Sequence, residues 1–235
     1  MMTIKYYIQM FLSRIGYRIE KVQPNINPLD VFHSHICMLG LDNEKCCFVQ
    51  IGANDSISGD PIKNYIEKYQ WSGLMVEPNP RVFDKLLNLQ RKNSKIKLDN
   101  IAIHSSKNTE VLYAPLSSSH DFSGLGSFNK TNVLMQVPFG AKIEEIVIQC
   151  MNLHDCLNKN EVSIVDILQI DTEGYDYEII KQIDFNLISP KIINYEHVHL
   201  SVNDRHACQL YLAKMGYSFY IKGLDTMAVK LQLKK

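Results

Sequence analysis

The fold of this chain is decided by the stretch Phe48-Val49-Gln50-Ile51-Gly52-Ala53-Asn54-Asp55. Its apolar first half predicts a buried strand, Gly52 predicts a tight turn, and residues 61–69 carry a helical pattern. In open α/β sheets, such strand ends present backbone N–H groups and a helix start to nucleotide-like ligands. The turn holds a single glycine, whereas the dinucleotide fingerprint has three. A ligand without a pyrophosphate therefore suits this turn better.

Two more strand ends follow along the chain. Residues 73–76 predict a strand that ends at Glu77-Pro78-Asn79-Pro80, and residues 165–170 predict one that ends at Asp171-Thr172-Glu173-Gly174. An acid at the end of the second strand is placed to accept hydrogen bonds from two ribose hydroxyls. Parallel strands end at the same edge of a sheet, so the three strand ends predict one ligand pocket.

The chain resembles S-adenosyl-L-methionine-dependent methyltransferases of the FkbM family. The resemblance rests on five segments in their order along the chain: FVQIGAND, LMVEPNP, LDNIAIHSS, LQIDTEGYDYEII and IINYEH. It implies an α/β fold, a Rossmann-like seven-stranded sheet that is mostly parallel, with one antiparallel strand near the C-terminus and helices on both faces. It also implies methyl transfer to a hydroxyl of a sugar, a glycan or a related small molecule, as in polysaccharide biosynthesis.

The cofactor S-adenosyl-L-methionine is expected at the first two strand ends. Gly52, Ala53 and Asn54 would enclose its methionine part, and Asp55 would bind its amino group. Glu77 would accept the ribose hydroxyls.

The adenine ring is expected at the end of a third strand, predicted over residues 96–103. Asn100 would contact the exocyclic amine of the ring and Ile101 would pack on it, although Asn100 has the alternative of shaping the chain only locally. Family members often carry glycine where Ser56 stands, so a positive φ at this position would strain the backbone.

The catalytic candidates are His197, Asp171 and Glu173. A hydroxyl acceptor needs a base as its proton leaves, and an imidazole titrates near neutral pH. His197 follows the fifth predicted strand, and His199 is a weaker alternative. Asp171 and Glu173 could bind the cofactor's amino group, the acceptor or His197. No metal is required, but the alternative is a divalent metal held by Asp171, Glu173 and His197.

The organisation predicted for the chain is an N-terminal helical extension over residues 1–45 and a methyltransferase domain over residues 46–235. Residues 1–22 predict an amphipathic helix that packs on the domain, on a second subunit in a homodimer, or on a membrane surface. Residues 117–132 are rich in Ser and Gly and predict a lid over the pocket.

The net charge and the cysteine content limit which partners and which cellular compartment are expected. The formal net charge is 0, which gives no general attraction to nucleic acid. The six cysteines lack metal-ligand spacing and suit reduced thiols, so a cytoplasmic location is expected, with residues 1–22 as an optional contact to the inner membrane face. Two other functions remain open: a non-catalytic, cofactor-binding subunit of a glycan-assembly complex, and an NAD-dependent sugar-modifying enzyme.

Overall fold

The computed structural model describes residues 31–57, 59–116, 122 and 124–231. The helix predicted over residues 1–22 and part of the predicted lid, residues 117–121 and 123, lie outside the described residues. Within the described ranges, no helix is both long enough and apolar enough to cross a bilayer.

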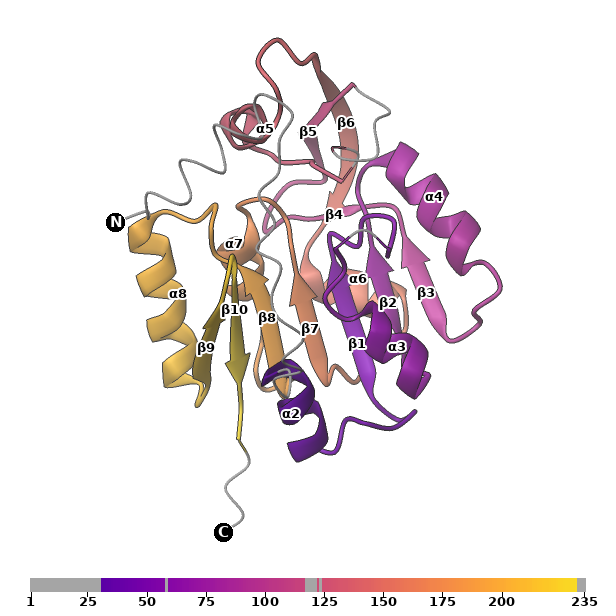
Figure 1. The fold of residues 1–235 in the computed structure, drawn as a ribbon, viewed down its shortest axis with the longest axis vertical. Coiled ribbons are helices and arrows are strands. Elements are labelled where there is room, and N and C mark those ends of the chain that lie inside the picture. The colour runs from indigo at the N-terminus through magenta and orange to yellow at the C-terminus, as the bar shows by residue number, and fades with distance from the viewer. Residues whose placement is uncertain (1–30, 58, 117–121, 123, 232–235) are drawn as a thin grey trace, which may run out of the picture.

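A seven-stranded sheet forms the centre of the molecule, with strand order β3-β2-β1-β7-β8-β10-β9 (Figure 1). β10 runs antiparallel to both of its neighbours, whereas the pairs from β3 through β8 are parallel. The predicted fold class is therefore confirmed. The strands are β1 (Cys47–Ile51), β2 (Ser72–Val76), β3 (Ile96–Asp99), β7 (Ile167–Ile170), β8 (Ile192–Glu196), β9 (Ser218–Lys222) and β10 (Asp225–Val229).

Helices cover both faces because the central strands are apolar on both sides. Side chains alternate along a strand, so Val49 and Ile51 lie in one apolar core while Phe48 lies in the other. The first core includes residues of α6 (Leu153–Lys159), α7 (Asp176–Ile180) and α8 (Val202–Lys214). The second includes residues of α2 (Val31–Met38), α3 (Lys63–Tyr69) and α4 (Pro80–Gln90).

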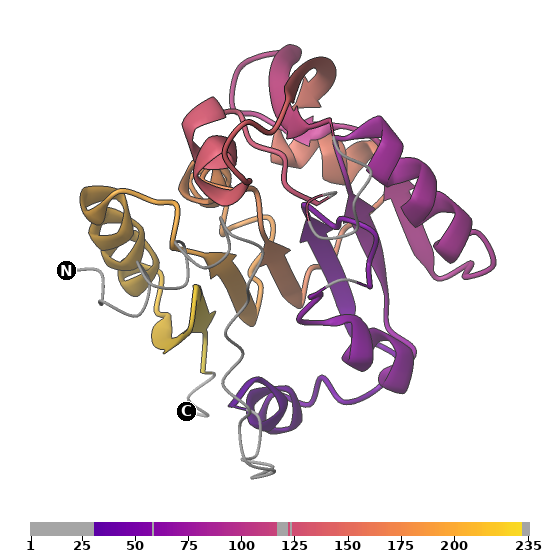
Figure 2. The same cartoon turned by 45° about the horizontal axis from the view of Figure 1, so that its top comes forward.

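A second, three-stranded sheet has the order β4-β6-β5, from β4 (Ala102–Ile103), β5 (Thr109–Pro115) and β6 (Ile143–Met151). Together with α5 (Lys130–Gln136) it lies beyond the carboxyl ends of β1 and β7 (Figures 1 and 2). The prediction of one strand over residues 96–103 was therefore wrong. β3 leaves the large sheet after Asp99, and the chain then joins the small sheet by pairing β4 with β6.

The order of the large sheet reverses at β1, which pairs with β2 on one side and β7 on the other. α3 after β1 and α7 after β7 cover opposite faces, so the connections diverge at the carboxyl ends of these two strands. In open α/β sheets such a switch point leaves a crevice in which ligands bind.

Candidate functional site

A cavity of about 1070 Å³ opens at this switch point, between the large sheet and the small one. Its floor comes from the ends of β1, β2, β7 and β8, and its far wall includes Phe122, Leu125 and Phe128. The described part of the predicted lid thus lines the cavity. The polar residues of the lining include Gln50, Asn54, Asp60, Glu77, Asn79, Gln136, Gln169, Asp171, Thr172, Glu173, Tyr175, Glu196 and His199.

The turn after β1 brings two strand ends into close approach. Gly52 has φ +80°, and its backbone N–H donates to the Val76 carbonyl at 2.9 Å, as does that of Ala53 at 3.0 Å. A Cβ atom at position 52 would lie 1.8 Å from the Asp171 carbonyl oxygen. Only glycine fits here, because the position needs both a positive φ and the absence of a side chain.

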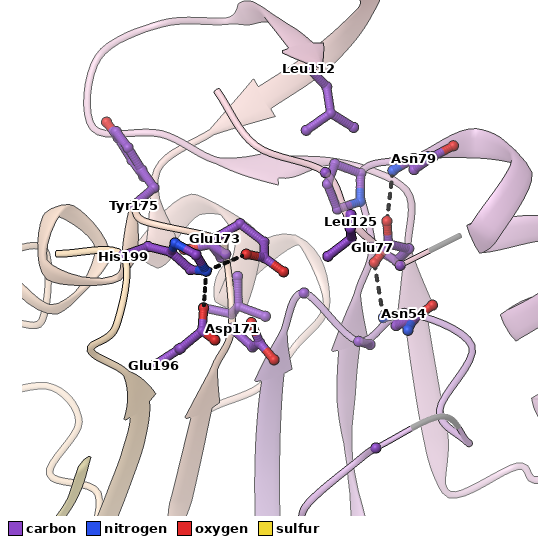
Figure 3. A pocket seen from close by; sticks show the side chains of 18 of the residues that line it. Asn54, Glu77, Asn79, Leu112, Leu125, Asp171, Glu173, Tyr175, Glu196 and His199 are labelled. Carbon is purple, nitrogen blue, oxygen red and sulfur yellow. Dashed lines mark hydrogen bonds and ion pairs between the residues drawn. The ribbon is translucent and has the colours of Figure 1, made fainter. Parts of the chain in front are cut away.

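Glu77 presents a buried carboxylate beside this turn (Figure 3). Its Oε2 accepts the Asn54 backbone N–H at 2.9 Å, and its Oε1 accepts the Asn79 backbone N–H at 2.8 Å. Burial raises the pKa of Glu77 to about 7, despite these two hydrogen bonds, which favour the ionised form. Each carboxylate oxygen keeps a further lone pair for a ligand in the cavity.

Of the other residues predicted to bind the cofactor, Ala53, Asn54, Ile101 and Asp171 line the cavity. Asn100 does not belong to the lining: its amide donates to the carbonyls of Glu77 at 2.7 Å and Pro78 at 3.2 Å. The local, chain-shaping alternative for Asn100 therefore fits the structure.

Asp55 also lies outside the lining, because its Oδ1 accepts the Ile57 backbone N–H within the loop at 2.9 Å. The loop position of Ser56 does have a positive φ, 56°. Ser56 is buried, and its hydroxyl accepts a hydrogen bond from the Gln90 side chain at 2.9 Å, which offsets part of the backbone strain.

On the other side of the β1 end lies an acidic group, which we define as Asp171, Glu173 and Glu196 (Figure 3). His199 contacts two of its members: its Nε2 lies 3.0 Å from Glu173 Oε2 and 3.7 Å from Glu196 Oε2. Asp171 is the exposed member of this group and lines the cavity. Desolvation and the neighbouring Glu173 raise its pKa well above the usual range.

α5 and the segment before it hold Glu173 in place. Glu173 has φ 55°, a strained value for a residue with a side chain. Its carbonyl accepts Ser127 Oγ and Asn132 Nδ2, each at 2.8 Å, and its Oε2 accepts Gln136 Nε2 at 2.6 Å. These three hydrogen bonds stabilise the strained backbone and direct the carboxylate into the cavity.

Asp176, the first residue of α7, joins the ends of β7 and β8. Its Oδ2 accepts the Thr172 hydroxyl at 2.7 Å, and its Oδ1 accepts the Glu196 backbone N–H at 3.0 Å. The side chain is fully buried, and burial raises the pKa of Asp176 to about 6. Asp176 thereby fixes the backbone that carries the acidic group.

His197 does not lie where the sequence analysis expected it. Its Nδ1 lies 3.0 Å from Thr226 Oγ1 of β10, its backbone N–H donates to the Leu224 carbonyl, and it is absent from the cavity lining. A turn closed by the Leu200 N–H and the His197 carbonyl brings His199 into the cavity instead.

The metal alternative with His197 must be corrected accordingly. The group of potential ligands among the described residues is Glu173, Glu196 and His199. Glu196 was missed as a site residue, although an acid at the end of β8 is the same signal that identified Glu77. Gln50 and Gln169 were also missed. Their signal was a polar residue within an otherwise apolar strand.

Residues 50–219 match the methyltransferase FkbM domain. The chain belongs to this family. The FkbM methyltransferase domain thus spans most of the chain and includes both sides of the cavity. No curated protein matches the chain.

Several solved methyltransferase structures are similar to this chain at low sequence identity. The methyltransferase FkbM from Methylobacillus flagellatus KT is 16% identical over 80% of this chain, with a TM-score of 0.52. The match covers 44% of that chain. Precorrin-6y C5,15-methyltransferase from Geobacter metallireducens GS-15 is 12% identical, with a TM-score of 0.45 over 89% of this chain and 91% of the other. The N-terminal domain of human METTL16 in complex with SAH is 14% identical, with a TM-score of 0.45 over 95% of this chain and 79% of the other.

Proposed function

We propose that this methyltransferase transfers the methyl group of S-adenosyl-L-methionine to a hydroxyl of a sugar, a glycan or a related small molecule. The observation that carries the proposal is the position of the Glu77 carboxylate. It faces the same cavity as the acidic group, and the end of β1 lies between the two (Figure 3). One cavity therefore offers a ribose-binding acid on one side and proton-accepting groups on the other.

The Glu77 side suits the nucleoside of the cofactor. The two free lone-pair directions of the carboxylate can accept both ribose hydroxyls while the backbone N–H groups hold the side chain in place. Pro78 and Ile101 line the adjacent wall and offer an apolar surface to the adenine ring. The cofactor also carries an ammonium and a sulfonium, and Asp171 supplies a carboxylate at the β7 end of the cavity.

The opposite side suits an acceptor hydroxyl. The displacement requires acceptor oxygen, methyl carbon and sulfur in a line, which is mainly an orientation effect. The acidic group and His199 provide bases for the leaving proton. Phe128 and Tyr175 pack edge to face at 5.0 Å between ring centroids and line the neighbouring wall, a surface for the C–H face of a sugar ring.

The volume of the cavity supports two occupants. Small-molecule sites usually measure about 300–1,000 Å³. At about 1070 Å³, this cavity lies just above that range, which leaves room for a small acceptor beside the cofactor.

The test is a calorimetric titration of the full chain with S-adenosylhomocysteine and, in parallel, with NAD. We expect one equivalent of S-adenosylhomocysteine to bind, and NAD not to bind. Glu77→Ala removes two charge-assisted hydrogen bonds to ribose, about 3 kcal/mol in total, and should weaken binding about 100-fold. Glu67→Ala, which alters an exposed acid of α3, is the control and should bind like the wild type.

Binding of NAD instead, or no binding of S-adenosylhomocysteine by folded protein, would overturn the proposal. If S-adenosylhomocysteine binds, the acceptor class is then tested by measuring its formation from S-adenosyl-L-methionine with hydroxylated sugars, against the same sugars with the hydroxyls blocked. Turnover that does not depend on free hydroxyls would contradict the acceptor assignment.

A further inference from the structure

We propose that Glu173, Glu196 and His199 bind a divalent cation of the Mn²⁺ or Zn²⁺ class within the acceptor side of the cavity. The inference deepens the proposed function and rests on it, because the cation would hold the acceptor hydroxyl. It differs from the metal alternative of the sequence analysis in two ligands, with Glu196 and His199 in place of Asp171 and His197.

The spacing of the three potential ligand atoms fits a metal ion. All three lie within 4.8 Å of one another. His199 Nε2 lies 3.0 Å from Glu173 Oε2 and 3.7 Å from Glu196 Oε2. Bonds of about 2.1 Å place neighbouring ligand atoms about 3.0 Å apart in an octahedral site and about 3.4 Å apart in a tetrahedral one. Small side-chain movements would therefore complete either geometry.

An unpartnered oxygen points to a ligand at this place. Glu196 Oε2 is buried and has no hydrogen-bond partner among the described residues, and the whole residue is 8% exposed. Within those residues, His199 is the only ion-pair partner of Glu173 and Glu196. A buried carboxyl oxygen without a partner is costly. A divalent cation bound between Glu173 and Glu196 would give this oxygen a partner.

Hydrogen bonds from neighbouring residues hold Glu173 and Glu196 in place, as they commonly do for metal ligands. Gln136 donates to Glu173 Oε2, and the Glu173 carbonyl accepts Ser127 and Asn132. The Glu196 backbone N–H is bonded to Asp176. Such supporting hydrogen bonds orient ligands before the ion arrives. Two carboxylates with one imidazole are a donor set suited to Mn²⁺ or Zn²⁺.

The bound ion would act as a Lewis acid on the acceptor. Three protein ligands leave a coordination position toward the cavity for the hydroxyl oxygen. Coordination would lower the pKa of that hydroxyl, and Asp171, which lies beside Glu173 and Glu196 in Figure 3, would take the proton. The oxygen then bonds to the methyl carbon as the carbon–sulfur bond breaks, and the sulfur keeps the electron pair.

The test measures Mn²⁺ binding by electron paramagnetic resonance on the full chain after chelator treatment. We expect one saturable site. Glu196→Gln keeps the shape of the side chain but removes its charge, and should weaken binding at least about tenfold, as should His199→Gln. Glu178→Gln changes a half-exposed glutamate of α7 that pairs with Lys181, and should leave the affinity unchanged.

Two results would overturn the cation site. One is the absence of saturable binding of both Mn²⁺ and Zn²⁺, the latter measured by competition with a chromophoric chelator. The other is binding that neither Glu196→Gln nor His199→Gln weakens, although both variants keep the native fluorescence of the buried Trp71. S-adenosylhomocysteine is titrated into the same metal-free samples. Cofactor binding without cation binding contradicts only this inference, and the reverse contradicts only the proposed function.

Discussion

Lowering the pH from 8 to 6 should weaken the binding of S-adenosylhomocysteine about tenfold through Glu77 alone. Burial raises the pKa of this carboxyl group to about 7 in the ligand-free protein. The ribose hydroxyls donate hydrogen bonds, so they bind the ionised carboxylate and lower its pKa. Binding is therefore coupled to the loss of a proton from Glu77 whenever the pH lies below about 7.

The magnitude follows from the ionised fraction of Glu77. With a pKa of about 7, roughly nine-tenths of the carboxyl group is ionised at pH 8 and roughly one-tenth at pH 6. The tenfold ratio corresponds to about 1.4 kcal/mol of binding free energy. At pH 7, about half a proton per site should leave upon binding.

The assay is calorimetric titration at pH 6, 7 and 8, repeated at pH 7 in two buffers of different ionisation enthalpy to count the released protons. Glu77→Gln is the matched variant, because it keeps the size of the side chain and removes the titration. Other acids of the cavity, such as Asp171, are common to both proteins and cancel in the comparison. An identical pH dependence in the wild type and in Glu77→Gln would refute the reasoning.

The remaining predictions concern stability, measured by urea unfolding with the fluorescence of Trp71, the only tryptophan, as the signal. Gly52→Ala should destabilise the fold by at least about 3 kcal/mol, because the new Cβ would overlap the Asp171 carbonyl at the end of β7. Gly140→Ala is the control: it has a similar φ of +83° and no atom within 4 Å, so it should cost only about 1 kcal/mol of backbone strain. Equal losses of stability in the two variants would contradict the close approach of Gly52 and Asp171. Asp176→Ala should cost about 3 kcal/mol because the Thr172 hydroxyl and the Glu196 backbone N–H lose their acceptor, while Asp84→Ala on the exposed face of α4 should be nearly neutral. A loss below about 1 kcal/mol for Asp176→Ala would show that these donors find other partners.

Part of the cavity lining was predictable from local sequence. A run of consecutive apolar residues predicts a buried strand, and the residue that follows the run then lies at the carboxyl edge of the sheet. Gly52, Glu77 and Asp171 were identified in this way, and all three line the cavity. The fold class was implied by the resemblance to the FkbM family, which rests on the segments that contain these strand ends.

The placement of the two histidines and of Glu173 and Glu196 was decided by tertiary structure. Beyond the last paired residue of a strand, the direction of a side chain depends on the turn that follows and on the partners it finds. His197 is held by β10, and the turn after it brings His199 to the acidic group. Glu173 and Glu196 come together only because β7 and β8 are neighbours and because α5 holds Glu173 from the small sheet's side.

The sequence by itself therefore determined the sheet and the acids at the ends of its strands, because burial and alternation are local properties of the chain. Only the tertiary structure decided which imidazole faces the cavity, where residues 96–103 divide between two sheets, and which carboxylates share one site. Those outcomes depend on hydrogen bonds and strand pairings between segments far apart in the sequence, and no local pattern records them.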